Sequence, residues 1–90
     1  MRSKPKLVLY FREGCHLCED MAQQLDELLD PASFELIRVD IDEDPVLKVT
    51  HNARVPVLSC DQIDLCEHFL DLEAVKDALA SYNRASPSVS

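Results

Sequence analysis

Two of the four cysteines in this chain of 90 residues, Cys15 and Cys18, stand three positions apart, with His16 and Leu17 between them. Proteins use a C-x-x-C spacing either for thiol–disulfide exchange or for binding a metal ion. On a helix, residues three apart share one face with Cβ atoms about 5–6 Å apart, which is close to disulfide range. The chemistry of the pair therefore depends on the element that carries it.

The surrounding residues predict that the pair opens a helix directly after a buried strand. The apolar run at 7–11 is typical of a strand buried on both faces. Gly14, the only glycine in the chain, indicates a tight turn before Cys15. From Cys18 onward the apolar residues recur at helical, one-sided spacing until Asp30 and Pro31 end the helix. The predicted core residues of this helix are Met21, Leu25 and Leu28.

This placement gives the two cysteines different roles. Cys15 lies in the first turn of the helix, where unpaired backbone N–H groups and the helix dipole favour an anion. A thiolate forms there more readily, and the thiolate is the nucleophilic form. Cys18 lies one turn deeper on the apolar face, so we expect Cys15 to attack a disulfide and Cys18 to resolve the mixed disulfide. Arg12 and a protonated His16 would stabilise the thiolate. Three nearby carboxylates, Glu13, Glu19 and Asp20, oppose them.

The remaining pattern predicts one domain over residues 1–82 with the element order βαβαββα. Residues 34–41 read as a central strand, parallel to the first through a right-handed crossover. Asp44 and Pro45 begin a short helix that ends at His51, and the two segments 55–60 and 63–66 form short strands. A last helix runs from Leu72 to Tyr82, capped by Asp71. The polar segment 83–90 is expected to be a disordered tail.

Composition excludes several classes of function. The net charge of −8 and the pI near 4.6 disfavour nucleic acid and anionic lipid as partners, because the only basic cluster is Arg2, Lys4 and Lys6. No apolar run approaches a membrane span, and the first residues do not resemble a signal peptide. We therefore expect a monomer in the reducing cytoplasm. The acidic run at 40–44 lacks the calcium loop of an EF-hand and is better explained by capping.

Two motifs carry a resemblance to a known family. They are Tyr10-Phe11-Arg12-Glu13-Gly14-Cys15-His16-Leu17-Cys18 and Val55-Pro56-Val57-Leu58. The sequence resembles glutaredoxin, within the thioredoxin superfamily, and most closely the small bacterial glutaredoxin-like proteins that carry Cys-His-Leu-Cys. The resemblance extends from Lys6 to about Tyr82 and implies a thioredoxin-like α/β fold, with a four-stranded mixed sheet flanked by helices.

The resemblance assigns further roles. It makes Cys15 the nucleophile and Cys18 the resolving thiol. Pro56 matches the cis-proline that faces the active site, and the backbone of Val55 would pair with an extended substrate. Arg12 stands where glutaredoxins often have lysine, and His16 stands where they usually have proline.

One departure concerns glutathione. The Gly-Gly pair that usually docks glutathione after the third strand is missing. The stretch 60–65 instead carries two carboxylates, Asp61 and Asp64, which are expected to repel glutathione.

These observations predict a thiol–disulfide oxidoreductase that cycles a Cys15–Cys18 dithiol and disulfide without an organic cofactor or metal. Its partner would be a protein disulfide or a small-molecule disulfide, with glutathione or a reductase as the source of electrons. Two alternatives stay open: a redox-inactive interaction module, and a metal-binding protein that adds Cys60 and Cys66 as ligands. We expect Cys60 and Cys66 to be core thiols. His51 and His68 are expected to be surface residues without a catalytic part.

Overall fold

The computed structural model describes residues 4–85, with side chains as far as Tyr82, and its elements follow the predicted order βαβαββα. The four strands are β1 (Lys6–Phe11), β2 (Glu35–Asp40), β3 (Val57–Cys60) and β4 (Ile63–Glu67). The helices are α1 (His16–Leu28), α2 (Pro45–His51) and α3 (Leu72–Ala85), and two short 3-10 turns are η1 (Pro31–Ser33) and η2 (Ile41–Glu43).

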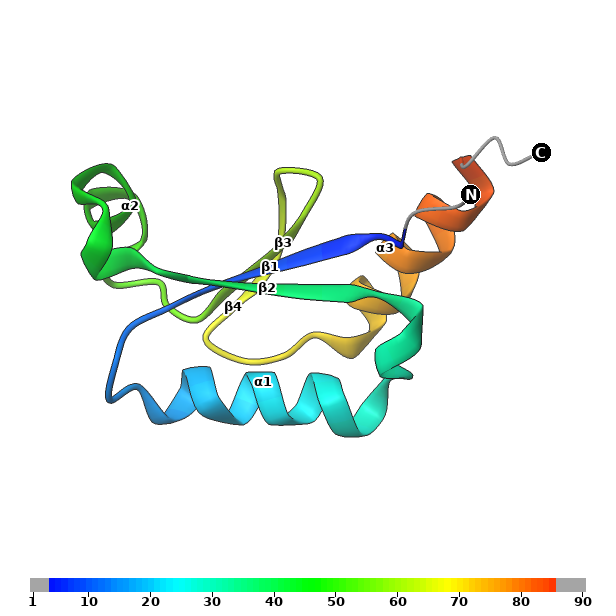
Figure 1. Cartoon of the computed structure of the whole chain (residues 1–90), viewed down its shortest axis with the longest axis horizontal. Helices are drawn as coiled ribbons and strands as arrows, with labels where there is room; N and C mark the ends of the chain where they lie inside the picture. Colours follow the sequence, from blue (N-terminus) through cyan, green and yellow to red (C-terminus); the bar gives the residue numbers. More distant parts are fainter. Residues whose placement is uncertain (1–3, 86–90) are drawn as a thin grey trace.

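The strands form one mixed sheet in the order β2-β1-β3-β4. β1 pairs in parallel with β2 and antiparallel with β3, and β3 pairs antiparallel with β4. Helix α1 runs along one side of the sheet, whereas α2 lies on the other side, at the end of the sheet where α1 begins (Figure 1). The carboxyl ends of β1 and β2 and the start of β3 meet at this end, which we call the cysteine end because Cys15 and Cys18 lie there.

The prediction of a central strand at 34–41 is wrong, because β2 is an edge strand. None of its six residues is fully buried, and Glu35 and Arg38 are exposed. Its apolar residues occur on both faces because each face is partly covered. Strand order depends on pairing with β1, a contact distant in sequence that the local pattern of β2 does not encode.

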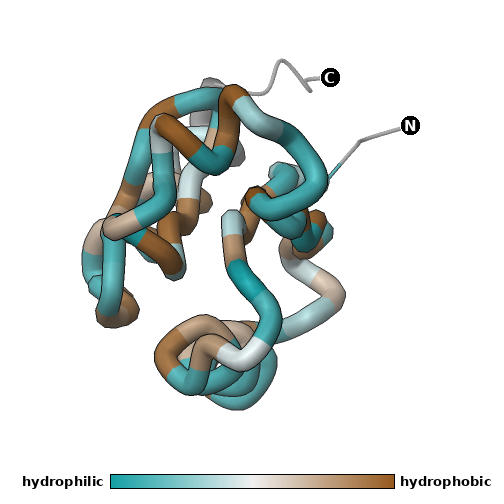
Figure 2. Tube along the Cα trace, turned by 90° about the vertical axis from the view of Figure 1, so that its left-hand side faces the viewer, coloured by the Kyte–Doolittle hydropathy of each residue, from teal (hydrophilic) through white to brown (hydrophobic). Residues whose placement is uncertain are grey.

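Helix α1 packs the predicted apolar face against the sheet. Cys18, Met21, Ala22 and Leu25 are buried in the interface. Figure 2 looks along α1 from the cysteine end and shows hydrophilic segments on the outer side of the helix. The core prediction is wrong for Leu28, which is 55% exposed. The helix stops there, and the extended backbone of the next residue turns that leucine side chain toward the core instead.

The acidic run between β2 and α2 acts as a pair of caps, as predicted. The Asp40 carboxylate accepts a hydrogen bond from the Asp42 N–H at 2.9 Å, and Asp44 accepts one from the Val46 N–H at the same distance. These bonds satisfy amide donors at the starts of η2 and α2 that have no partner within the turn or helix. They position the segment that leads to the second motif.

The last helix begins as predicted and ends later. Asp71 accepts a hydrogen bond from the Ala74 N–H at 3.1 Å, which makes it the cap of α3. Val75 on this helix is fully buried in the core. The helix continues to Ala85, three residues beyond the expected end, so the predicted tail is shortened and its remaining residues, 86–90, lie outside the described part. Among residues 4–85, none of the helices has the length and apolar character needed to cross a bilayer.

Candidate active site

The cysteine pair lies where strand β1 turns into helix α1, as its sequence context predicts. Gly14 adopts φ +77°, a left-handed conformation that glycine reaches without the steric cost of a side chain. Cys15 is then the N-cap of α1, and its Sγ accepts a hydrogen bond from the Cys18 N–H at 3.1 Å. The Cα atoms of the two cysteines are 5.2 Å apart and their sulfurs form a disulfide. The predicted proximity is confirmed.

The two sulfurs differ in access. Cys15 is half-buried at the surface, whereas Cys18 is 3% exposed and belongs to the buried interface of α1. Behind Cys18 lies a cavity of about 370 Å³, lined among others by Leu9, Ala22 and Arg38. Because a reagent approaching from solvent reaches Cys15 first, the geometry fits the roles that the sequence predicts for the two thiols.

The second motif lies beside the first. The peptide bond between Val55 and Pro56 is cis, which confirms what the resemblance implies. Val57, the first residue of β3, pairs with Tyr10 near the carboxyl end of β1, so Pro56 stands next to the loop that leads to Cys15. No hydrogen bond within residues 4–85 engages the backbone of Val55. Its N–H and C=O groups are therefore free to pair with an extended chain.

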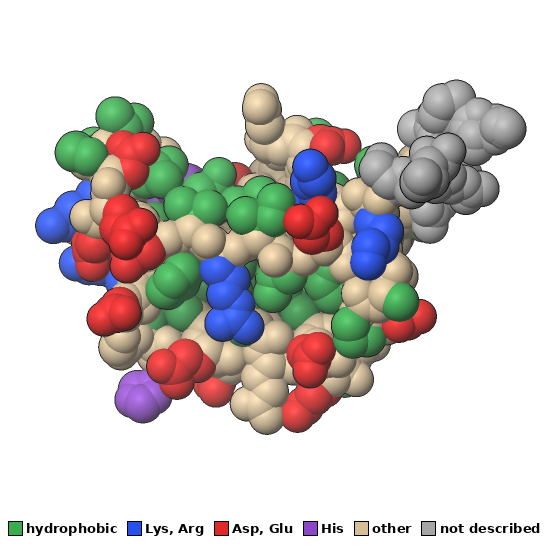
Figure 3. Space-filling view, viewed as in Figure 1, with side chains coloured by type: hydrophobic (Ala, Val, Ile, Leu, Met, Phe, Trp, Pro, Cys, Tyr) green, Lys and Arg blue, Asp and Glu red, His purple; other side chains and the backbone are tan. Residues whose placement is uncertain are grey.

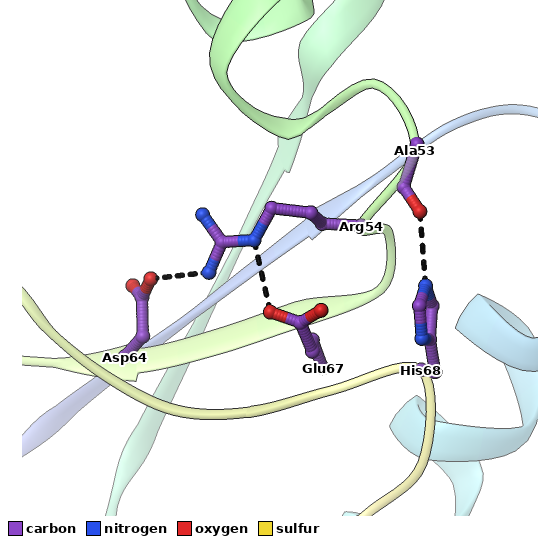
Figure 4. A network of polar contacts seen from close by, with 5 residues as sticks. All are labelled: Ala53, Arg54, Asp64, Glu67 and His68. Carbon is purple, nitrogen blue, oxygen red and sulfur yellow. Dashed lines mark hydrogen bonds and ion pairs between the residues drawn. The ribbon is translucent and has the colours of Figure 1, made fainter.

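A polar network fixes the loop that precedes the cis-proline (Figure 4). The Arg54 guanidinium donates to Asp64 at 2.6 Å and to Glu67 at 2.9 Å, both on β4. These hydrogen bonds to carboxylates raise the pKa of Arg54, so its charge is permanent. The pairs are partly exposed, and we expect a modest effect on stability, since such pairs contribute about 0–1 kcal/mol.

His68 completes this network. Its ring Nε2 lies 2.9 Å from the Ala53 carbonyl oxygen, which can only accept, so Nε2 carries the proton. Its backbone N–H donates to the Pro56 carbonyl oxygen at 2.8 Å. His68 is expected to be a surface residue without a catalytic part; it is half-buried, and it binds the loop before the cis-proline. Sequence reasoning missed Arg54, Asp64, Glu67 and His68 as a group.

The Arg12 side chain binds groups other than the Cys15 thiolate, which it is expected to stabilise. Its guanidinium donates to the Asn52 side chain at 2.7 Å and lies 3.3 Å from the Asp42 carboxylate. Arg12 therefore links the loop before Cys15 to η2 and to the end of α2. Its effect on the thiolate stays a prediction, as does that of His16, which is exposed at the start of α1.

His51 is not on the surface. Its side chain is 7% exposed and its ring stacks on Tyr10, with centroids 4.5 Å apart and an interplanar angle of 25°. The ring Nδ1 is buried without a hydrogen-bond partner. The prediction is wrong because the burial of His51 comes from the contact of α2 with β1, which is distant in sequence. We infer a packing role for this ring.

The other two thiols are free. Cys60 is 5% exposed and pairs with Leu7 near the start of β1, at the end of the sheet opposite Cys15. Cys66 is half-buried against the core. Burial raises the pKa of both thiols, so they are neutral at pH 7. Within the described residues no group of three or more His, Cys, Asp or Glu side chains could hold a metal ion.

The two carboxylates expected to repel glutathione differ in their surroundings. Asp61 belongs to the turn between β3 and β4, where both turn residues have positive φ, at the end of the sheet opposite Cys15. Asp64 is neutralised by Arg54. Any selection against an anionic partner must therefore come from other residues.

Comparisons with known proteins agree with this geometry. A family model described as "Glutaredoxin-like domain (DUF836)" matches residues 6–80. The uncharacterized protein Rv0508 of Mycobacterium tuberculosis is 33% identical over 64 residues. That match covers 66% of this chain and 66% of the relative, so the chain spans just under two thirds of the relative's length. Solved structures are also similar, and two of them are described next.

Protein Ne2328 from Nitrosomonas europaea is 40% identical with a TM-score of 0.71, over 91% of this chain and 94% of that one. A mutant thioredoxin from Halobacterium salinarum is 25% identical with a TM-score of 0.57, over 89% of this chain and 75% of that one. The predicted thioredoxin-like α/β fold is confirmed.

Proposed function

This chain belongs to the glutaredoxin-like domain family, and we propose that it is a thiol–disulfide oxidoreductase that uses Cys15 and Cys18. The observation that carries the proposal is the disulfide at the start of α1, in which one sulfur is accessible and the other is buried. A purely structural disulfide would need no such difference in exposure.

The reduced protein acts in two steps. The Cys15 thiolate attacks one sulfur of a substrate disulfide, whose S–S bond breaks as a mixed disulfide forms and the first substrate sulfur leaves as a thiolate. The Cys18 thiolate then attacks the Cys15 sulfur, the mixed disulfide breaks, and the second substrate sulfur leaves. The two leaving thiolates take up the protons that the protein thiols lost. The protein dithiol is oxidised by two electrons and the substrate disulfide is reduced by the same two.

Each neighbouring group has a function in this scheme. The Cys18 N–H, which points at the Cys15 sulfur, stabilises negative charge there before the attack. The free backbone groups of Val55 pair with the substrate chain next to its disulfide, in the manner of strand addition. Arg12, His68 and Arg54 hold the two loops at a fixed separation.

The test is single-turnover reduction of a peptide disulfide by the reduced protein, followed by acid quench and alkylation. We expect wild-type protein to yield a Cys15–Cys18 disulfide and one equivalent of peptide dithiol. Cys18→Ser should accumulate a mixed disulfide on Cys15, and Cys15→Ser should lose at least about 100-fold in rate, because the remaining thiol is buried.

Cys66→Ala is the matched control, since it removes a thiol outside the disulfide. Its rate should equal that of the wild type. If wild type and Cys15→Ser react equally slowly, the domain is a redox-inactive interaction module. Metal bound in stoichiometric amount to the purified protein and lost with stability on chelation would favour the metal-binding alternative.

A further inference from the structure

Three basic side chains in the segments around the disulfide are ion-paired, and together they have three carboxylate partners, Asp42, Asp64 and Glu67. Arg12 lies 3.3 Å from Asp42, and Lys48 lies 3.9 Å from the same carboxylate. Arg54 bridges Asp64 and Glu67 on β4. These three are the Lys and Arg residues of the described segments 12–20, 41–56 and 67–71, which surround the disulfide. None of them is free to attract an anion from solution.

Carboxylates beside the disulfide have no such partner. Glu13 precedes the cysteine pair, and Glu19 and Asp20 follow it on the first turns of α1. All three are exposed, and no ion pair within residues 4–85 involves them. Figure 3 shows acidic side chains along the left-hand end of the molecule, around the start of α1 and near α2.

One basic residue faces the rear of the pair. Arg38, on β2, lines the cavity behind Cys18 and forms no ion pair among the described residues. Arg12, Glu13 and Glu19 line the same cavity. Arg12 is paired with Asp42, so the charges of the lining that have no ion-pair partner are Arg38 and the two glutamates. Among these unpaired groups the two carboxylates outnumber the one cation.

Apolar side chains are exposed at the same end. Leu17, inside the C-x-x-C motif, is 37% exposed. Phe69 is 70% exposed and directly follows His68, whose backbone N–H binds the Pro56 carbonyl oxygen. These residues belong to the two segments that flank the disulfide. An apolar contact with an acidic border suits a polypeptide better than a small, highly charged disulfide.

We infer that the substrate is a disulfide in a cationic polypeptide, with Lys or Arg beside its cysteines, and that anionic disulfides such as oxidised glutathione are disfavoured. This inference rests on the proposed function and names its substrate class. The unpaired carboxylates attract the cationic flanks and raise the rate of encounter, whereas an anionic disulfide meets repulsion that the paired arginines do not relieve. The apolar residues then contact the chain beside its disulfide.

The experiment uses two cyclic disulfide peptides that differ only in Lys or Glu next to the cysteines. Stopped-flow mixing with reduced protein gives a second-order rate constant for each. Each constant is divided by that of the same peptide with neutral dithiothreitol, because Lys flanks alone make a disulfide more reactive. We expect the normalised ratio of Lys to Glu peptide to be about tenfold at 20 mM salt and below about threefold at 500 mM, because salt screens the attraction.

Matched variants locate the effect. Glu13→Gln/Glu19→Gln should reduce the normalised ratio at least about twofold, since two of the attracting charges are removed. Glu27→Gln/Glu35→Gln removes the same charge at the opposite end of the molecule, and it should keep the wild-type ratio. A change in the reactivity of Cys15 itself would alter the rate constants of both peptides equally and leave their ratio unchanged.

The outcomes separate the inference from the proposed function. A normalised ratio near one that does not respond to salt overturns the cationic substrate class while exchange itself stands. Equal loss of the ratio in both double variants also overturns it, because net charge alone would then be responsible. If neither peptide reacts faster with wild type than with Cys15→Ser, the proposed function fails as well.

Discussion

The Nε2 of His68 lies 2.9 Å from the carbonyl oxygen of Ala53, and the same residue's backbone N–H binds Pro56. One residue thus binds the chain on both sides of Val55. Since the backbone of Val55 is the expected contact for an extended substrate, His68 is a positioning residue for that contact.

His68→Gly removes the ring and preserves the backbone, because glycine tolerates the φ of +68° that His68 adopts. Losing one hydrogen bond should lower the free energy of unfolding by about 1 kcal/mol, measured by urea denaturation. We expect KM for a peptide disulfide to rise while the rate of Cys15 alkylation by iodoacetamide is unchanged. His68→Asn is a second variant for the same two measurements, KM and the alkylation rate of Cys15. If the alkylation rate of Cys15 changes as much as KM does, the substitution has caused a general loss of structure instead.

The Arg12–Asp42 pair predicts opposite effects on Cys15. Asp42→Asn frees the Arg12 guanidinium from its counter-charge, so the pH midpoint of Cys15 alkylation should fall. Arg12→Met should raise it by less than about 0.5 pH units, because an ion-paired, partly exposed cation contributes little. The measurement is the alkylation rate against pH, with a wild-type midpoint expected below about pH 8.5. Identical midpoints in all three proteins would remove Arg12 from the tuning of the thiolate.

Gly14→Ala tests the turn before Cys15. An added Cβ would meet no atom within 4 Å, so the entire cost comes from the positive φ. We expect a loss of about 1–2 kcal/mol in the free energy of unfolding. Gly14→Asn should lose less, because asparagine enters this conformation more easily. If alanine and asparagine cost the same, the turn adopts a different conformation in solution.

We predict that the fold tolerates replacement of the buried His51 ring by a phenylalanine ring. His51→Phe keeps the ring stacked on Tyr10 and removes the unpartnered Nδ1, so stability should stay equal or rise by up to about 1 kcal/mol. His51→Ala leaves a cavity and should cost about 2–4 kcal/mol. Thermal and urea unfolding measure both. Destabilisation by Phe as large as that by Ala would mean that the imidazole nitrogens make a bond essential to the fold.

The raised pKa values of Cys60 and Cys66 predict a loss of stability at alkaline pH. In the unfolded chain both thiols ionise near their ordinary pKa, whereas in the folded chain they stay protonated to higher pH. The folded state therefore binds more protons, and its stability falls as pH rises above the ordinary value of 9.0. Urea denaturation at pH 8 and pH 10 should show a smaller fall in Cys60→Ala/Cys66→Ala than in the wild type. An equal fall would assign the pH dependence to other groups.

Local signals in the sequence predict the elements that carry the disulfide. Gly14 and the helical spacing after Cys18 predict α1, and Asp44 with Pro45 predicts α2 to the residue. These signals succeed because turns and caps depend on neighbours within about four residues.

Contacts between elements that are distant in sequence could not be predicted from such local signals. The burial of His51 depends on α2 lying over β1, and the pairs of Arg54 depend on the register of β4. The outward direction of Leu28 depends on where α1 meets the sheet. For the same reason the sequence does not show that Asp61 lies at the end of the sheet opposite Cys15, or that Asp64 is paired with Arg54. The charge pattern at the cysteine end becomes visible only when the segments that surround it are known.

The edge position of β2 bears on how these molecules behave at high concentration. An edge strand presents unpaired backbone groups to which another chain could add a strand, which is a common start of aggregation. Three of the six residues of β2, Glu35, Arg38 and Asp40, are charged. Charged residues among the apolar residues of β2 make the addition of a strand from another copy costly. The residues that leave β2 only partly buried therefore also oppose aggregation along this edge.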